Sequence, residues 1–285
     1  MSLSAITLHA RRDPGFDDRK AHALAVLRQA AERHRGRIVF TTSLGAEDMV
    51  LTDLIASHGL PITLATLQTG QLHRETLALL DRVEQHYGVA IERWAPDAAE
   101  VRRFEAEHGE LPMRRSVGLR QACCALRKLA PLARALAASS AWVTGLRRGQ
   151  SGARADVPFS STDEHGREKL SPLADWSQAD VWHYIAAHGV PYNELHDRHY
   201  PSIGCSPCTR PVTPGEDVRA GRWWWESGSA KECGLHRKPH ACDAPAADGP
   251  RSGPSTFASA QVHVGSADVN RSQSAAAMDT SKETA

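Results

Sequence analysis

The chain has 285 residues, a hydrophobic content of 41% and a formal net charge of +1 from 34 basic and 33 acidic residues. The balanced charge excludes a global attraction to nucleic acid or to a membrane surface, so anion recognition has to come from local clusters. A chain of this size can bury one substantial core, and we expect one main domain with appendages. Its start lacks a signal-peptide pattern and no stretch approaches about 20 apolar residues, so we expect a cytoplasmic protein without nucleic-acid or membrane partners.

Helical and strand patterns alternate along the chain after a polar start. The pattern predicts helices at 20–35, 46–58, 72–87, 98–108 and 119–138, and strands at 37–43, 62–67, 89–94 and 141–145. Ser177 and Asp180 form a capping-box-like start for one more helix. This alternation predicts an α/β fold with a mostly parallel sheet flanked by helices.

The chain divides by composition into four parts. Residues 1–19 form a polar N-terminal extension, and residues 20–194 form the α/β domain. Residues 195–240 are rich in Cys, Pro, Gly and Trp, which predicts loops and short helices organised by ligands. Residues 241–285 have almost no large apolar groups, so we expect a disordered tail.

Four cysteines occur as two pairs. Cys123 and Cys124 are adjacent in the predicted helix 119–138, and Cys205 and Cys208 form a CxxC. Four thiolates can close a zinc or an iron–sulfur site. Neighbouring helical residues point about 100° apart, which favours a bulky cluster over one zinc ion and predicts a local kink. The alternative is two buried helix cysteines and an unrelated redox pair.

Cys233 stands apart in the segment Glu232-Cys233-Gly234-Leu235-His236. The glycine gives backbone freedom, and the histidine is one group that can help to hold a thiolate. An incidental thiol is the alternative. Cys242 lies in the predicted tail, and we assign it no role.

A strand that ends at Ser43-Leu44-Gly45 and opens a helix aims backbone N–H groups and a helix dipole at one point, which suits phosphate or sulfate. An ordinary strand–helix turn is the alternative. Cationic residues follow other elements: Arg147, Arg148 and Arg154 after strand 141–145, Lys128 one helical turn beyond Cys124, and Arg219 and Arg222 beside Trp223-Trp224-Trp225. Each of these cations taken singly is usually a solvated surface group, and the tryptophan run also suits packing.

Together these residues resemble the sulfonucleotide reductase family, specifically the iron–sulfur-containing adenylyl-sulfate reductases, over roughly residues 20 to 240. The fingerprint joins Cys123-Cys124, Cys205-x-x-Cys208, Glu232 to His236 and Gly221-Arg222-Trp223-Trp224-Trp225-Glu226. The resemblance implies an adenine-nucleotide α-hydrolase-like (PP-loop) fold. Residues 43–48 read Ser-Leu-Gly-Ala-Glu-Asp where ATP pyrophosphatases carry Ser-Gly-Gly-x-Asp-Ser, which weighs against ATP cleavage and for a sulfonucleotide.

The resemblance also implies roles for individual residues. It implies one [4Fe–4S] cluster per subunit on Cys123, Cys124, Cys205 and Cys208, and a nucleophile at Cys233 on a mobile C-terminal segment. Residues 20–194 would then bind the nucleotide, and residues 195–240 would hold the cluster and the nucleophile. The expected substrate-binding residues are Ser43, Gly45, Thr69, Lys128, Gly145, Arg154, Arg219, Arg222 and His236.

The expected activity is reduction of adenylyl sulfate to sulfite and AMP through an S-sulfocysteine on Cys233, in assimilatory sulfate reduction and cysteine biosynthesis. Thioredoxin or glutaredoxin would be the reductant, so the enzyme acts on a sulfur group with a disulfide as acceptor. A homo-oligomer is expected by family analogy alone. Gln68, where Asp or Asn is typical, and Gly149, where an acidic residue is usual, depart from the family pattern.

Three other functions remain open at this point. The first is a phosphoadenylyl-sulfate reductase, or an enzyme that accepts both nucleotides. The second is a PP-loop enzyme that uses ATP to thiolate tRNA. The third is a non-catalytic, zinc-stabilised nucleotide-binding module, in which residues 232–236 would have no role.

Overall fold

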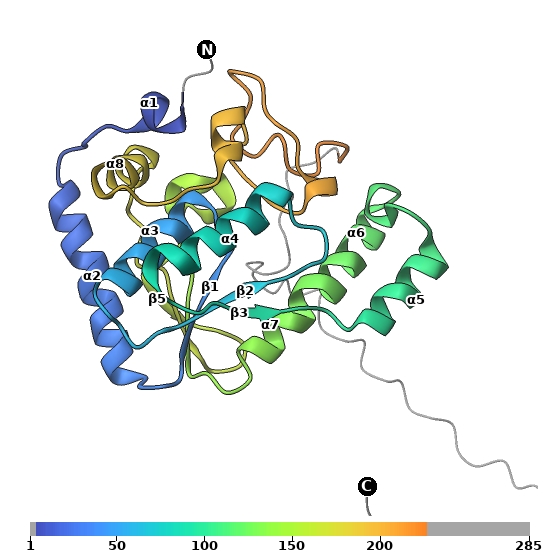
Figure 1. Ribbon diagram of the computed structural model, residues 1–285, viewed down its shortest axis with the longest axis horizontal. Coiled ribbons are helices and arrows are strands. Elements are labelled where there is room, and N and C mark those ends of the chain that lie inside the picture. The colour runs from blue at the N-terminus through green and yellow to red at the C-terminus, as the bar shows by residue number, and fades with distance from the viewer. Residues whose placement is uncertain (1–3, 227–285) are drawn as a thin grey trace, which may run out of the picture. The chain divides into compact units, whose positions relative to one another are not determined.

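Six strands form one sheet in the order β3-β2-β1-β4-β6-β5 in the computed structural model, which describes residues 4–226 (Figure 1). All neighbouring strands are parallel except β5, which runs antiparallel to β6. The strands are β1 Ile38–Thr42, β2 Thr63–Leu67, β3 Glu92–Trp94, β4 Ala141–Val143, β5 Ser160–Thr162 and β6 Glu168–Leu170. The predicted α/β class with a mostly parallel sheet is confirmed.

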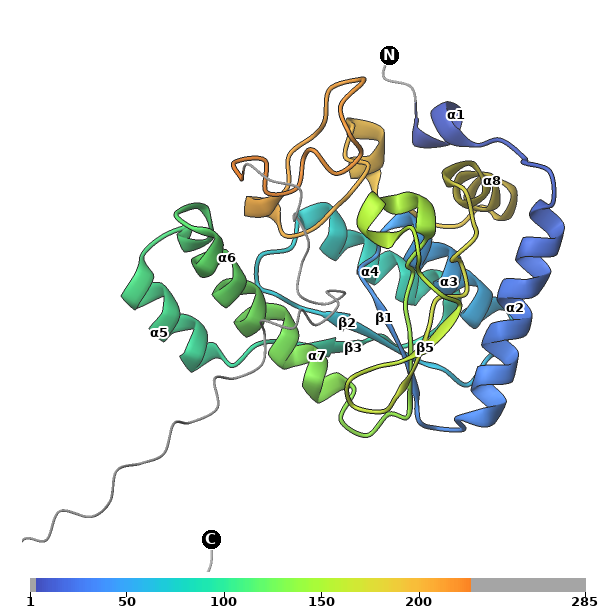
Figure 2. The same cartoon turned by 180° about the vertical axis from the view of Figure 1, so that it is seen from behind.

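Helices cover both faces of this sheet. The α-helices are α1 Ala5–His9, α2 Phe16–Arg33, α3 Ala46–Ser57, α4 Arg74–Tyr87, α5 Ala98–His108, α6 Val117–Cys124, α7 Ala130–Ala135 and α8 Gln178–His188. Short 3₁₀ turns are η1 Pro112–Arg114, η3 Arg148–Gln150, η4 Gly152–Arg154, η5 Glu194–Arg198 and η6 Ser206–Cys208. The segment that ends at Glu226 lies above the sheet, with α1 and α8 on one side and α6 on the other, in both views (Figures 1 and 2).

The side chains of β1 alternate between the two faces of the sheet, and a separate hydrophobic core lies on each face. Ile38 and Phe40 belong to the larger core, which residues of α2, α3, α4 and α8 complete. Val39, on the opposite face, packs in a smaller core with Leu132 of α7 and Trp142 of β4. Successive strand residues point to opposite faces, so a central strand that is buried on both faces reads as a continuous apolar run.

The predicted helix 119–138 is divided into three parts. α6 ends at Cys124, a π turn, η2, spans Ala125–Leu129, and α7 follows. Pro131 lacks an N–H, and its ring crowds the carbonyl four residues earlier, that of Arg127 inside the π turn, which accounts for the interruption. The distortion predicted at the adjacent cysteines therefore takes the form of a π turn that begins at the next residue.

The capping box predicted for α8 is present. The Ser177 hydroxyl accepts the N–H of Asp180 at 3.0 Å, and the Asp180 carboxylate accepts the N–H of Ser177 at 2.8 Å. The same carboxylate, whose side chain is 0% exposed, receives two hydrogen bonds from Arg19 of α2 at 2.8 and 2.9 Å. This bidentate pair joins α2 to the start of α8.

Several elements differ from the sequence expectation, and α2 begins at Phe16 instead of residue 20. The hairpin of β5 and β6 and the helix α1 were not expected, because three-residue strands and a five-residue helix carry no measurable hydrophobic period. The third strand begins at Glu92 instead of Val89. The predicted tail at 241–285 lies outside the described residues. No helix within residues 4–226 has the length and apolar character that crossing a membrane requires.

Removal of Arg19 tests the pairing of α2 with α8. Arg19→Ala leaves the buried Asp180 without its cation, so we expect a loss of about 3 kcal/mol in the free energy of unfolding, measured by urea titration. Arg33→Ala is the matched control, because Arg33 of the same helix pairs with Glu168 while its side chain is 55% exposed, and it should cost about 0–1 kcal/mol. Equal losses in the two variants would contradict the assignment.

Candidate active site

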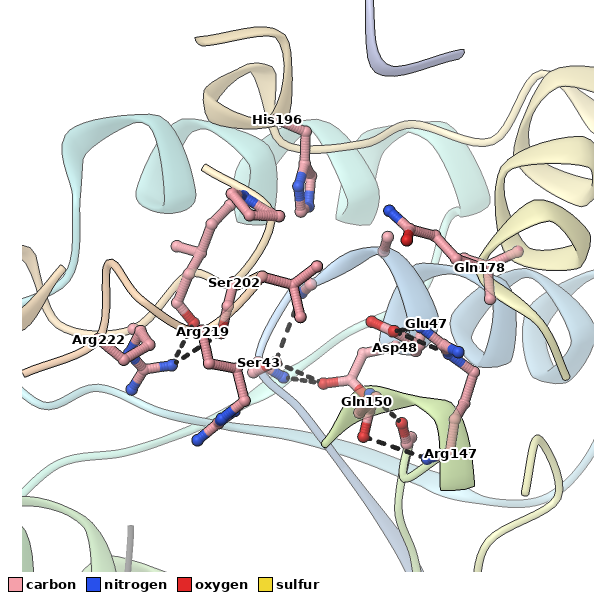
Figure 3. Close-up of a pocket in the computed structure, with 18 of the residues that line it drawn as sticks. Ser43, Glu47, Asp48, Arg147, Gln150, Gln178, His196, Ser202, Arg219 and Arg222 are labelled. Atoms are coloured by element: carbon pink, nitrogen blue, oxygen red, sulfur yellow. Dashed lines mark hydrogen bonds and ion pairs between the residues drawn. The ribbon is translucent and has the colours of Figure 1, made fainter. Parts of the chain in front are cut away.

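A cavity of about 570 Å³ opens at the carboxyl edge of the sheet. Strand order reverses around β1, which has β2 on one side and β4 on the other, and α/β sheets place their ligand crevice at such a point. The loops after these three strands reach the cavity through Ser43, Thr69 and Gly145. Figure 3 shows Ser43 in this cavity, beside Asp48. The structure brings together every expected substrate-binding residue in its described part: Ser43, Gly45, Thr69, Lys128, Gly145, Arg154, Arg219 and Arg222. His236 and Cys233 lie outside the described residues.

The loop after β1 is held by hydrogen bonds to the carboxylate of Asp48, in the first turn of α3. Asp48 accepts hydrogen bonds from the backbone N–H and the hydroxyl of Ser43, both at 2.6 Å. Burial raises the pKa of Asp48 to about 6, although the two bonds from Ser43 oppose the shift. Gly145 permits this arrangement, because a Cβ atom there would lie 2.0 Å from Asp48 Oδ1. The glycine therefore sets how closely the loops after β1 and β4 approach each other.

An ion pair between the buried Arg147 and the partly buried Glu47 forms the neighbouring wall. Arg147 donates from Nε and Nη2 to the Glu47 carboxylate at 2.9 and 2.8 Å. Burial alone would raise the pKa of Glu47, but the charge of Arg147 and hydrogen bonds from Gln150 and Arg147 outweigh it and hold the pKa below its usual value. The charge of Arg147 is thus balanced within the protein. Arg148, which pairs with Asp175, does not line the cavity.

Cations gather at the opposite end of the cavity, which we call the cationic end: Lys128, Arg219 and Arg222. Arg222 is 7% exposed and its guanidinium lies 4.7 Å from the centre of the Trp223 ring. A Cβ atom on Gly204 would lie 2.3 Å from a terminal nitrogen of Arg222. The glycine before Cys205 therefore leaves the space in which this guanidinium lies.

The two cysteine pairs meet beside this cationic end. Cys123, Cys124, Cys205 and Cys208 all line a second cavity of about 20 Å³. Lys128 lines both cavities, so it stands between the thiols and the larger cavity. The Sγ atom of Cys205 lies 3.4 Å from Oγ1 of Thr69. Within residues 4–226, no group of three or more His, Cys, Asp or Glu side chains is arranged to hold a single metal ion.

Burial controls the acidity of the innermost thiols. It raises the pKa of Cys123, and it raises the pKa of Cys208 to about 12, while the nearby cations Lys128 and Arg127 or Arg222 oppose these shifts. Without a metal these thiols stay protonated at neutral pH, so neither serves as a free nucleophile. Metal coordination would have to displace their protons.

The tryptophan run anchors the C-terminal segment next to the cysteines. Trp223 is 1% exposed and packs with Cys123 and Cys208. Arg120 of α6 lies 4.7 Å from the centre of the Trp223 ring and forms a 2.5 Å ion pair with Glu226. The expected packing role of the run is therefore present. It fixes the chain at Glu226, seven residues before Cys233.

Sequence reasoning missed several residues that line the large cavity. His196 of η5 and Gln178 of α8 line the cavity and were not expected there. Glu47 and Asp48 also line it, and they had been considered only as part of the loop motif at residues 43–48. The sequence around His196 does not indicate that this residue lines the cavity, because its position depends on contacts with α8. The unusual pair of acidic residues at a turn that was expected to bind an anion was the available signal for Glu47 and Asp48.

The chain matches the phosphoadenosine phosphosulfate reductase domain over residues 37–211. This match covers more than half of the chain. The chain belongs to this reductase family. Among curated relatives, it is 55% identical to the adenosine 5'-phosphosulfate reductase of Allochromatium vinosum over 243 residues, which cover 83% of this chain and 94% of that protein. It is also 55% identical to the protein of the same name from Burkholderia cepacia, covering 74% and 85% of the two chains.

A solved member of the reductase family has the same fold. The phosphoadenylyl-sulfate reductase of Candida auris, crystallised as a phosphate complex, aligns with a TM-score of 0.55 and 27% identity. The alignment covers 69% of this chain and 97% of that protein. The expected adenine-nucleotide α-hydrolase-like fold is confirmed.

Substitution of Gly145 tests the close approach of its loop to Asp48. Gly145→Ala forces the Asp48 carboxylate to move, so we expect a loss of about 1–3 kcal/mol in the free energy of unfolding, measured by denaturant titration. Gly152→Ala is the control, because a Cβ atom there would meet no atom within 4 Å, and its effect should stay below about 0.5 kcal/mol. An unchanged stability in Gly145→Ala would show that the two loops are not in tight contact.

Proposed function

We propose that the chain reduces adenylyl sulfate to sulfite and AMP, with Cys233 as the nucleophile. The observation that carries this proposal is the position of Lys128, which lines both the large cavity and the four-cysteine cavity. A thiolate and a sulfate are both anionic, so their reaction requires local positive charge. The cationic end supplies that charge at the point where the cysteines lie. The names of the relatives at 55% identity support the same substrate.

The reaction is a two-step transfer. The Cys233 thiolate attacks the sulfate sulfur, an S–S bond forms, and the S–O bond to the phosphate breaks, so that AMP leaves with the electron pair. A thiolate of an external dithiol protein of the thioredoxin or glutaredoxin class then attacks Cys233 Sγ and releases sulfite. The second thiol of that protein resolves the mixed disulfide. The two electrons therefore come from the dithiol.

The residues that line the cavity take distinct parts in this reaction. Lys128, Arg219 and Arg222 would neutralise the sulfate and phosphate oxygens, together with His236. Ser43, Gly45, Thr69, Gly145 and Arg154 would hold the rest of the nucleotide. Glu226 is anchored by Arg120, and the seven residues from there to Cys233 can span up to about 25 Å when extended.

The four-cysteine cavity supports one [4Fe–4S] cluster per chain. Its donor set is four thiols from two separate segments around one small space, with Arg127 and Lys128 beside it. Cys123, Cys124, Cys205 and Cys208 would each bind one iron through a thiolate. When bound, the cluster would supply local charge and would fix the segments that carry Lys128 and Gly204.

Three further expectations complete the proposal. We place the protein in the cytoplasm, in the assimilation of sulfate for cysteine synthesis, and expect a homo-oligomer by analogy with the family. A phosphoadenylyl-sulfate reductase remains the second candidate, favoured by the solved relative from Candida auris.

Sulfite release under anaerobic conditions tests the nucleophile. With thioredoxin as reductant, we expect wild type to consume adenylyl sulfate, and Cys233→Ser to be slower by at least about 10³-fold, because it lacks the attacking thiolate. Cys242→Ser is the matched control and should keep wild-type activity. Substantial sulfite release by Cys233→Ser would contradict the proposal.

The same assay compares the two nucleotides. A kcat/KM for phosphoadenylyl sulfate at or above that for adenylyl sulfate would favour the second candidate. Turnover of ATP would favour neither reductase.

Iron analysis tests the cluster separately from the reaction. Anaerobically purified wild type should hold about four iron atoms and about four labile sulfides per chain. Replacement of Cys123, Cys124, Cys205 or Cys208 by Ser should lower both, while Cys233→Ser should keep both. Zinc in place of iron in the wild type would contradict the cluster and leave the fold unchanged.

A further inference from the structure

His196 is a buried histidine that points into the large cavity. It belongs to η5 and is 8% exposed, and Figure 3 shows its ring directed from η5 towards the space over the Ser43 loop. The backbone of Tyr200 approaches the ring. Nevertheless, neither ring nitrogen has a hydrogen-bond partner in the described part of the chain. Leaving a buried polar group unpaired is unfavourable, so such groups often mark a place that a ligand completes.

The ring is held in this orientation by its surroundings. Trp182 of α8 meets it edge-on, with ring centres 5.1 Å apart. Asn193, which begins η5, donates to Thr76 of α4 at 2.9 Å and accepts the N–H of Leu195 at 3.1 Å. These contacts fix η5 on two helices. The imidazole is therefore preorganised instead of free to turn towards another partner.

The ring is uncharged at neutral pH. Burial lowers the pKa of His196 to about 4, even though the nearby Glu47 opposes the shift. A neutral imidazole offers one N–H donor and one nitrogen acceptor. It suits a hydroxyl, amine or ring nitrogen better than a phosphate or sulfate, which would gain no charge neutralisation from it.

The surroundings of His196 form a neutral end of the cavity, opposite in character to the cationic end. Gln178, Val181 and Trp182 of α8 line the cavity as His196 does, and Trp182 packs against the His196 ring. The nearby charge of Glu47 is balanced by its ion pair with Arg147, so the groups that remain to hydrogen-bond a ligand here are uncharged. Binding pockets for the uncharged parts of small molecules have this composition.

We propose that His196 hydrogen-bonds the nucleoside part of the substrate and so sets the nucleotide's direction in the cavity. The inference rests on the proposed function, because the substrate's anions are taken to occupy the cationic end. The nucleoside is the part of adenylyl sulfate that carries uncharged donors and acceptors. Gln178 is the second neutral group that this subsite presents to it.

Binding of AMP to the anaerobic holoprotein tests the inference. We expect His196→Phe to weaken AMP binding by about tenfold in calorimetry, because the ring keeps its bulk and loses both hydrogen-bonding nitrogens. His196→Gln, which retains a donor and an acceptor, should recover at least half of the loss on a logarithmic scale. Tyr192→Phe is the control, since Tyr192 packs on the same Trp182 but does not line the cavity. It should bind AMP as wild type does.

A set of AMP analogues separates a hydrogen bond from a loss of packing. The set comprises 2′-deoxy, 3′-deoxy, 6-deamino, 1-deaza, 3-deaza and 7-deaza AMP. One analogue that lacks the contacted group should bind wild type about tenfold more weakly than AMP, and bind His196→Phe as well as AMP does. Equal losses in both proteins for every analogue would overturn the inference, as would unchanged AMP binding by a folded His196→Phe.

The wild type distinguishes failure of the inference from failure of the proposed function. If wild type releases sulfite and binds AMP while His196→Phe binds AMP equally well, the inference alone fails. If wild type neither releases sulfite nor binds AMP, the proposed function itself fails.

Discussion

Lys128 places a positive charge where the large cavity meets the four cysteines. Two anionic reactants approach each other only where positive charge is already in place, and a charge fixed in a buried site acts more strongly than one in water. Lys128 lines the nucleotide-sized cavity and the cysteine cavity at once. Its position follows from the π turn at Ala125–Leu129, which begins directly after Cys124. The interruption of one helix thus links the two halves of the site.

The remaining parts of the site are organised around that link. The loops after β1, β2 and β4 converge at one edge of the sheet and leave a cavity whose two ends differ in charge. Glu47 balances Arg147 inside the wall, so the positive charge at the cationic end comes from other elements. Gly204 leaves space for Arg222 immediately before Cys205. The segment that contributes two of the cysteines therefore also positions a cation.

The fold could be predicted from the sequence because its signals are local. Buried strands such as 37–43 and the capping box at Ser177 depend on neighbouring residues, and the carboxyl ends of parallel strands meet at one edge whatever the details. The convergence of the loops at Ser43, Thr69 and Gly145 follows from the same rule. The hairpin of β5 and β6 lacked such a signal, since its strands are short and mostly polar.

The charge state and the partners of the site residues could not be predicted in this way. The pairing of Arg147 with Glu47 joins residues 100 positions apart, and the position of His196 depends on long-range contacts of η5 with α8 and α4. The joining of Cys123 and Cys124 with Cys205 and Cys208 is equally long-range. It was expected from a family resemblance, because spacing alone left an unrelated redox pair as an alternative.

An anaerobic crystal structure of the Cys233→Ser protein with adenylyl sulfate would reveal the direction of the nucleotide in the cavity. The variant should not consume the substrate, so the bound nucleotide can be observed. We expect the sulfate and phosphate to contact Lys128, Arg219 and Arg222 beside the four cysteines, with the nucleoside extending away towards His196. A nucleoside bound beside the cysteines, with its sulfate at the neutral end, would contradict this expectation.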